Sequence, residues 1–239
     1  SYSHGISFND VYQSLLSDYH RHKPSQNIDP SFFTEFDNIR DKIAMKLIHY
    51  ERNKELLEKV PHIRFLDLAI VFYCLIAMDF ATGNATILIH HSHLKNWNIT
   101  TTELFQIAKD NTQKILPEKL YDMNDVLYEL SGRLTHPDPT VSRPSPYPMF
   151  VLTNETNLFG AACMLYKDLL KHFSEKSQTD FYILPSSIHE VILVPTLEND
   201  CYGELSDMVR EVNDSQLMDD EILSTHAYYY SRRKNEITM

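Results

Sequence analysis

Residues 68–78, Leu-Ala-Ile-Val-Phe-Tyr-Cys-Leu-Ile-Ala-Met, form the longest apolar run of the chain. Eleven residues are too few to cross a bilayer as a helix, which needs about 20. The apolar side chains do not alternate with polar ones, and a strand of this kind is buried on both faces. The run therefore predicts a central strand. Its two predicted faces are Ile70, Phe72 and Cys74 on one side, and Val71, Tyr73 and Leu75 on the other.

A second β-prone run, residues 85–90, follows the first at hairpin distance. Asp79, Gly83 and Asn84 between the two runs favour turns, so the pattern predicts an antiparallel hairpin. Upstream, residues 43–50 suit either a helical continuation or a strand, and we favour a strand.

Helices are predicted on both sides of this hairpin. Thr100 and Glu103 have the spacing of a capping box, which predicts a helix that ends before Pro117. Asp29-Pro30 provides the N-cap and first residue of another helix. Further helices are predicted over residues 8–19, 53–60 and 124–130.

Five of the eleven prolines fall within residues 137–148. Proline fixes φ and lacks an amide donor, so this segment is neither a helix nor a central strand. It predicts an extended strap between two lobes. We expect an N-terminal α+β lobe over residues 1–131, the strap over 132–148 and a C-terminal α+β lobe over 149–239.

The pattern after the strap supports the second lobe. The predicted elements are a strand over 149–152, an amphipathic helix over 160–173, a hairpin of 181–184 with 191–194, a helix over 203–212, and one or two strands within 228–237. The predicted fold class is α+β, in which each lobe is an antiparallel hairpin or small sheet packed with helices.

Glycine content and net charge exclude several functions. The 239 residues include five glycines, and no two of them lie within twenty residues of each other. Dinucleotide fingerprints, P-loops and nucleophile elbows all need closely spaced glycines. The 22 Lys and Arg against 33 Asp and Glu give a net charge of −11, which repels nucleic acid and anionic membranes. We expect a protein or small-molecule partner instead.

The cysteines indicate a reducing compartment. Cys74, Cys163 and Cys201 are odd in number and lack metal or redox spacing. We therefore expect a cytoplasmic protein.

Histidine is the enriched reactive residue, with twelve in the chain. His91 and His93 come at the end of a predicted strand, where they would point to the same side and could both reach a zinc ion. Spacing identifies no third ligand, although His62, or His189 with Glu190, would serve if the fold brought them close. Strand-end histidines are more often surface or hydrogen-bonded residues. No cofactor is therefore predicted, and zinc at His91 and His93 is the alternative.

Ser186, Ser187, His189 and Glu190 are the candidate catalytic residues, because serine, histidine and a carboxylate crowd one turn. The competing interpretation is a plain hairpin loop, since Pro and Ser favour turns. Neighbouring strand residues face opposite sides. We therefore expect either His189 or Glu190 to point inward and to bond a polar group outside the hairpin.

Four stretches together resemble a family of bacterial proteins known only as a domain of unknown function. They are KLIHYERN (46–53), PHIRFLDLAIVFY (61–73), GNATILIH (83–90) and ILPSSIHEV (183–191). The resemblance spans about residue 30 to the end. It implies a cytoplasmic bacterial protein with this α+β arrangement, and an additional N-terminal segment in other members. It brings no established activity, cofactor or catalytic residues.

Two functions remain open from the sequence. The preferred hypothesis is a non-enzymatic intracellular binding or regulatory protein, because catalytic motifs are missing and Tyr and Phe are abundant. The alternative is a hydrolase, with or without a metal ion, that uses the histidine clusters.

Overall fold

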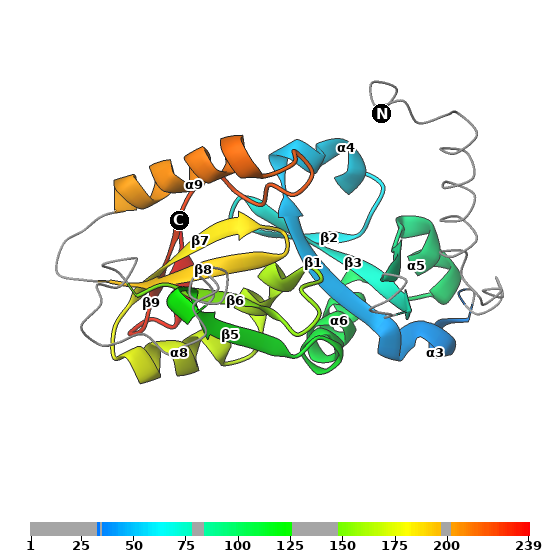
Figure 1. Ribbon diagram of the computed structural model, residues 1–239. Helices are drawn as coiled ribbons and strands as arrows, with labels where there is room; N and C mark the ends of the chain where they lie inside the picture. Colours follow the sequence, from blue (N-terminus) through cyan, green and yellow to red (C-terminus); the bar gives the residue numbers. More distant parts are fainter. Residues whose placement is uncertain (1–32, 34, 78–83, 126–147, 197–201) are drawn as a thin grey trace, which may run out of the picture.

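The computed structural model is built around the strand that the apolar run predicts. The structure describes residues 33, 35–77, 84–125, 148–196 and 202–239 (Figure 1). Strand β3 spans Leu68–Ala77, and its residues 68–75 are all buried. Even-numbered side chains such as Phe72 lie in the largest buried cluster, and odd-numbered ones such as Tyr73 lie in clusters on the opposite face. The predicted central strand and its two faces are confirmed.

The first sheet has four antiparallel strands. Its order is β1-β3-β2, and β4 also pairs with β3. The bounds are β1 Ile43–His49, β2 His62–Phe65 and β4 Ala85–Leu88. The strand at 43–49 and the hairpin of β3 with β4 confirm the predictions. Strand β2 was not predicted; Leu66 and Asp67 join it to β3, with Leu66 in the left-handed region at φ 54°.

Several helices and 3-10 segments accompany this sheet. They are α3 (Phe36–Ile39), η2 (Arg40–Lys42), η3 (Glu51–Asn53), α4 (Lys54–Leu57), α5 (His91–Trp97) and α6 (Thr101–Ile115). The predicted capping box of α6 is present, because Thr100 Oγ1 accepts from the Glu103 amide at 3.2 Å and the Thr100 amide donates to Glu103 at 2.8 Å. The predicted helix at 8–19 and the Asp29-Pro30 cap lie outside the described residues, as does most of the helix at 124–130.

The second sheet has six antiparallel strands in the order β10-β9-β7-β8-β6-β5. Their bounds are β5 Glu118–Asp122, β6 Phe150–Asn154, β7 Phe181–Ser187, β8 Glu190–Pro195, β9 Tyr228–Ser231 and β10 Glu236–Thr238. The hairpin of β7 with β8 and the two C-terminal strands confirm the predictions. Strand β5 was not predicted, and it joins this sheet from before the proline-rich segment.

Helices cover both faces of the second sheet (Figure 1). Helix α8 (Leu169–Ser177) packs Phe173 against Phe181 of β7. Helix α9 (Tyr202–Gln216) shares a buried cluster with Tyr182, the next residue of the same strand. Because successive strand residues face opposite sides, α8 and α9 lie on opposite faces of this sheet. The predicted helix at 203–212 is confirmed.

The predicted continuous helix over residues 160–173 is wrong. Residues 160–165 form a 3-10 segment, η4, and α8 begins only at Leu169. Asp168, just before α8, has a left-handed φ of 59°, which breaks the helical path. Residues 160–164 are all buried, so this segment lacks the polar face of a surface helix. Its apolar spacing reflects burial on all sides.

Segment η4 lies where the two sheets meet. The Ala161 amide donates to the Ile188 carbonyl, and the largest buried cluster contains Cys163 with residues from both sheets. The structure thus has two antiparallel sheets packed with helices, as the α+β prediction states, and one buried cluster runs across both. Residues 126–147 lie outside the described part of the chain, so the proline-rich strap and the boundaries at residues 131 and 149 stay predictions.

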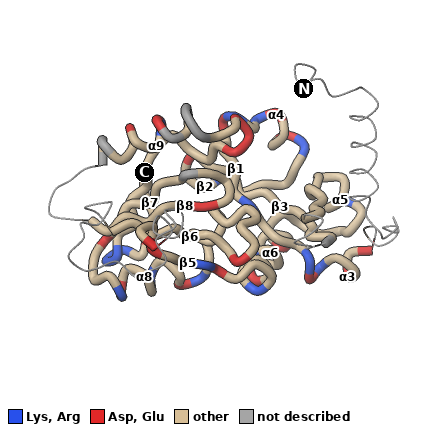
Figure 2. The backbone as a smooth tube through the Cα atoms, viewed as in Figure 1, with Lys and Arg blue, Asp and Glu red and all other residues tan. Residues whose placement is uncertain are grey.

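Charged residues lie mainly on the helices, the turns and strand β5 (Figure 2). Strands β3, β6, β7 and β9 contain no Lys, Arg, Asp or Glu. Strand β1 contains only Lys46 of this kind, and β8 contains only Glu190. In the described residues, no helix is long and apolar enough to cross a membrane.

The first prediction concerns Gly160. A Cβ atom at this position would lie 2.1 Å from Thr153 Oγ1 and 2.4 Å from the His189 carbonyl oxygen. Gly160→Ala should therefore lower the free energy of unfolding by about 1–3 kcal/mol or more, because the backbone must shift. Gly203→Ala is the matched control: nothing lies within 4 Å of its added Cβ. Urea denaturation should show a change of less than about 1 kcal/mol for that control, and equal effects of the two variants would contradict the prediction.

Candidate functional site

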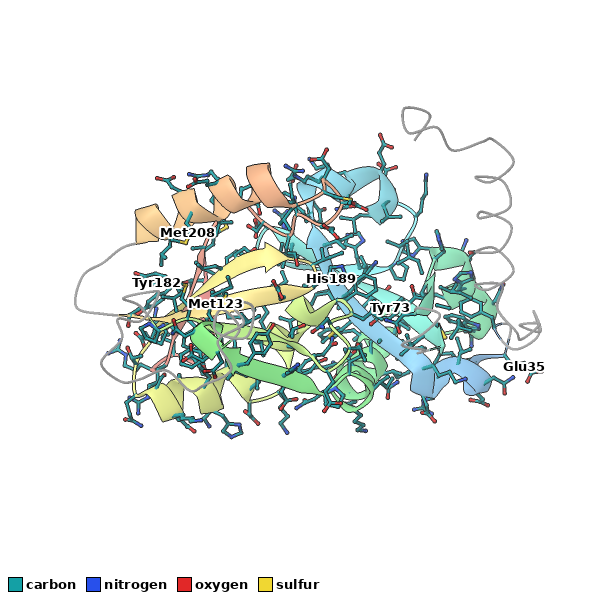
Figure 3. All side chains as sticks on the ribbon, viewed as in Figure 1. Glu35, Tyr73, Met123, Tyr182, His189 and Met208 are labelled. Atoms are coloured by element: carbon teal, nitrogen blue, oxygen red, sulfur yellow. The ribbon has the colours of Figure 1, made fainter. Side chains whose placement is uncertain are left out.

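Phe159 is the centre of a cluster of side chains where the β7–β8 turn meets the first sheet. Its ring lies 4.0 Å from Lys46 Nζ and makes an edge contact with the Tyr73 ring at 5.2 Å. The His189 ring is nearly parallel to it, with centroids 5.7 Å apart. Figure 3 labels Tyr73 and His189 on their strand and turn. We call Lys46, Tyr73, Phe159 and His189 the junction cluster.

The loop that presents Phe159 has an unusual backbone. Asn157 and Phe159 both have left-handed φ angles, 55° and 52°. A bulky residue rarely adopts this conformation. Side chains hold the loop in place, because Asn154 Oδ1 accepts from the Leu158 amide at 3.2 Å and Asn154 Nδ2 donates to the Leu158 carbonyl at 2.7 Å. The strained loop therefore places the Phe159 ring against both sheets.

His189 ties the hairpin to this loop. Its Nδ1 lies 3.0 Å from the Asn157 carbonyl oxygen and 3.3 Å from the Phe159 amide, and the tautomer decides which of the two contacts is a hydrogen bond. The Thr153 hydroxyl donates to the His189 carbonyl at 2.8 Å. The sequence predicted that the inward-pointing residue of the pair His189 and Glu190 would bond a polar group outside the hairpin. His189 makes such a bond, but His189 and Glu190 are both half-buried, so the expected division into an inward and an outward side chain is not confirmed.

The predicted strands 181–184 and 191–194 leave six residues, 185–190, for the hairpin loop, and the loop is shorter in the structure. Ser187 pairs with Glu190, so the strands extend to a tight turn at Ile188 and His189. The ladder is irregular between Leu184 and Ser187. The loop prediction failed because Pro185 and Ser186 favour turns locally, whereas here they continue a strand through this irregularity.

The structure does not join the side chains of Ser187 and His189 by a hydrogen bond. The hydroxyl oxygen of Ser187 accepts from the His189 backbone amide at 3.0 Å, and His189 Nδ1 faces the loop at 157–159. Ser186 lies in β7, but its side chain is outside the described part of the structure. Glu190 is half-buried, and burial raises the pKa of its carboxyl, an effect that nearby His189 partly offsets.

Lys46 and Tyr73 carry polar groups into largely apolar surroundings. Lys46 is half-buried, and burial lowers the pKa of its ammonium group. Among the described residues, no carboxylate forms an ion pair with it. Tyr73 is 1% exposed, and its hydroxyl has no hydrogen-bond partner in the described part of the chain. Burial raises the pKa of this hydroxyl.

Two cysteines are buried, free thiols. Burial raises the pKa of Cys74 to about 11 and that of Cys163 to about 12. The Cys163 thiol donates to the Thr153 carbonyl at 3.1 Å. Thiols of this kind are poor nucleophiles at neutral pH. Cys201 lies outside the described residues.

The zinc prediction placed His91 and His93 at the end of a strand, and that placement is wrong. His91 and His93 lie in helix α5, and His90 precedes it. His91 is exposed, whereas His93 Nδ1 accepts from the His90 amide at 2.9 Å and its ring stacks on Trp97. The His91 amide donates to the Lys59 carbonyl, so a distant residue helps to fix this helix start. Among the described residues, these histidines form no group with His62 or His189 that could hold a metal ion. In the described part of the chain, no group of three or more His, Cys, Asp or Glu residues could hold a metal ion.

Sequence reasoning missed a second polar cluster, which surrounds Asp67. One carboxylate oxygen accepts from the Ser224 hydroxyl and the other from the Tyr228 hydroxyl, each at 2.6 Å. His226 Nδ1 lies 3.8 Å from the same carboxylate. We call Asp67, Ser224, His226 and Tyr228 the Asp67 cluster. An acidic residue in a short turn between two strands was the available signal, but nothing in the sequence points to partners about 160 residues away.

The Asp67 cluster joins the two sheets. Asp67 lies in the β2–β3 turn of the first sheet, and its carbonyl accepts from the Tyr50 amide at 2.9 Å. Tyr228 begins β9 of the second sheet. His49 at the end of β1 is also near: burial lowers the pKa of its imidazole, and the charge of Asp67 acts in the opposite direction. Both oxygens of the carboxylate are thus occupied by contacts that hold the fold together.

Comparison with known proteins places the chain in a family. A family model described as "Family of unknown function (DUF5688)" matches residues 1–232, so the chain belongs to this family. This agrees with the resemblance to an uncharacterised family. No curated protein and no solved structure matches the chain.

The second prediction tests the link through Asp67. Asp67→Asn keeps the shape of the side chain but removes its charge and one acceptor, so we expect unfolding free energy to fall by about 1.5–3 kcal/mol. Asp219→Asn is the control, because Asp219 has a 99% exposed side chain in a surface ion pair with Arg52. That variant should change stability by less than about 0.5 kcal/mol. Denaturant titration measures both, and a neutral Asp67→Asn would show that the cluster does not hold the sheets together.

The third prediction concerns the pH dependence that Glu190 contributes. The pKa of its carboxyl is raised in the folded protein, so ionisation costs stability as pH rises above the usual value of 4.5. Glu190→Gln should therefore raise the melting temperature at pH 7, and the gain should disappear near pH 4, where the wild-type carboxyl is protonated. Thermal unfolding of both proteins at the two pH values provides the test. A gain that does not change with pH would mean that ionisation is not its cause.

Proposed function

We propose that this member of the DUF5688 family is a non-enzymatic intracellular binding or regulatory protein. One observation carries the proposal: among the described residues, the reactive side chains of Asp67 and His189 are hydrogen-bonded to other parts of the fold. Asp67 is occupied by Ser224 and Tyr228. His189 is directed at the backbone of residues 157–159. Each of these contacts joins segments that are far apart in the sequence.

The geometry of the β7–β8 turn supports this proposal over nucleophilic catalysis. An activated serine needs a base within hydrogen-bond reach of its hydroxyl. The hydroxyl of Ser187 contacts the His189 backbone amide, and Ser187 is 6% exposed. The two buried thiols, with raised pKa values, also favour a structural role.

The same proposal includes a cytoplasmic location and a protein or small-molecule partner. Free buried cysteines suit a reducing cytoplasm, as expected for the bacterial protein that the resemblance implies. The net charge of −11 favours a protein or small-molecule partner over nucleic acid or an anionic membrane.

One contact favours the alternative, a hydrolase. If Nδ1 of His189 donates to the Asn157 carbonyl, Nε2 carries a lone pair and is able to accept a proton. Such an enzyme would use His189 as a base beside Glu190, or zinc as a cofactor. The experiment must therefore separate a structural from a catalytic role of this residue.

The fourth prediction separates them by measuring stability and activity of the same variant. His189→Ala should lower unfolding free energy by about 1–3 kcal/mol, because the polar groups of residues 157–159 lose a partner. His91→Ala, at an exposed position of α5, is the control and should change stability by less than about 0.5 kcal/mol. Removing a catalytic residue would instead leave stability unchanged or raise it.

Activity is measured with the full chain, purified without an affinity tag. Nitrophenyl acetate and nitrophenyl phosphate should be hydrolysed no faster than in buffer, and elemental analysis should find zinc well below one ion per chain. Stoichiometric zinc would overturn the proposal. Hydrolysis that His189→Ala abolishes, with unfolding unchanged, would also overturn it.

A further inference from the structure

Lys46 departs from the pattern of occupied polar groups. It is the one Lys, Arg, Asp or Glu residue in β1, it is half-buried, and no carboxylate of the described residues pairs with it. The ring of Phe159, 4.0 Å from Nζ, is its close contact. Removing a cation from water without a counter-ion is costly, and a cation–π contact recovers only part of that cost. An anion at this position would recover more.

An unpaired donor lies on the same face of the sheet. Ala44 of β1 faces Tyr73 of β3, and Lys46 faces Val71, so Lys46 and Tyr73 are diagonal neighbours on one side of the sheet. Long side chains in this relation reach each other. Tyr73 and Lys46 also both contact the Phe159 ring. The Tyr73 hydroxyl is buried and without a partner among the described residues, which is uncommon for a buried polar group.

From this arrangement we propose that the junction cluster binds a small carboxylate ligand, which pairs with the Lys46 ammonium group and accepts a hydrogen bond from the Tyr73 hydroxyl. The inference rests on the proposed binding function and names its ligand class and site. The left-handed residues 157 and 159 hold the Phe159 ring against both groups. His189 positions that ring through its contacts with the loop.

The donors present favour a carboxylate over a phosphate. The site offers one ammonium group and a neutral hydroxyl, and phosphate sites normally add a guanidinium group or several free backbone amides. The amides of the left-handed loop are already used: Leu158 donates to Asn154 Oδ1, and Phe159 lies against His189 Nδ1. One positive charge with one hydroxyl matches the charge and size of a carboxylate.

The competing interpretation is that Lys46 only packs on Phe159. Lys119 supplies a matched control, because its Nζ lies 5.4 Å from the Tyr121 ring but the residue is exposed on strand β5. A lysine that only packs on an aromatic ring has no anion specificity beyond ionic strength. Lys46→Met and Lys119→Met therefore remove the same group from two sites, of which one is the proposed site.

The fifth prediction uses sodium acetate as the probe, with sodium chloride at equal ionic strength as reference. Acetate should raise the melting temperature of the full chain in a saturable way, and the association constant should fall about tenfold or more in Lys46→Met. Lys119→Met should bind as the wild type does. Tyr73→Phe, which removes one hydroxyl and leaves the ring, should weaken binding about threefold to tenfold.

Lys46→Arg is the second variant for the case in which Lys46→Met does not fold. It keeps the positive charge, so it should still bind acetate. Absence of an acetate effect beyond that of chloride would overturn the inference, as would equal binding by Lys46→Met. Phosphate that binds Lys46 more tightly than acetate would also overturn it, because the ligand class would be wrong. These failures would leave the hydrolysis and zinc assays unaffected, so the proposed function is tested separately.

Discussion

The arrangement of the two sheets depends on the close backbone approach at Gly160. Only a residue without a side chain fits against Thr153 and the His189 carbonyl. This contact lets η4 lie between β6, the β7–β8 turn and β1, where Cys163 and its neighbours join one buried cluster that runs across both sheets. It also fixes the end of the loop that turns Phe159 toward the first sheet. The junction cluster is therefore a consequence of how the sheets pack.

Asp67 provides a second link between the sheets, at a different place and of a different kind. Packing around η4 is apolar and non-directional, whereas the Asp67 carboxylate accepts two short hydrogen bonds from Ser224 and Tyr228. Charge-assisted hydrogen bonds require defined geometry. Together the two links fix both the separation of the sheets and the path of the C-terminal segment into β9.

The polar groups where the two sheets meet are of two kinds, those with hydrogen-bond partners in the described part of the chain and those without. Those of Asp67 and His189 are satisfied by hydrogen bonds to residues far away in the sequence. Lys46 and Tyr73 differ, since one is a half-buried cation without a carboxylate partner among the described residues and the other a buried hydroxyl without an acceptor there. That difference is the reason to look for a ligand at Lys46 and not at the histidine-rich start of α5.

The amino-acid sequence alone determined those helices and strands whose patterns depend on their own residues and near neighbours. The unbroken apolarity of residues 68–75 identified the central strand and both of its faces, and Thr100 with Glu103 identified the start of α6. These predictions hold because strand alternation and helix capping depend on neighbours in the sequence. Tertiary contacts decided the rest. Burial on all sides gave residues 160–164 a helix-like apolar spacing, and the Lys59 carbonyl helped to start a helix where a strand end was expected. Asp67 meets its partners about 160 residues away, and Lys46 meets Phe159 across the junction, because these pairings arise from packing of the two sheets, which no local spacing records.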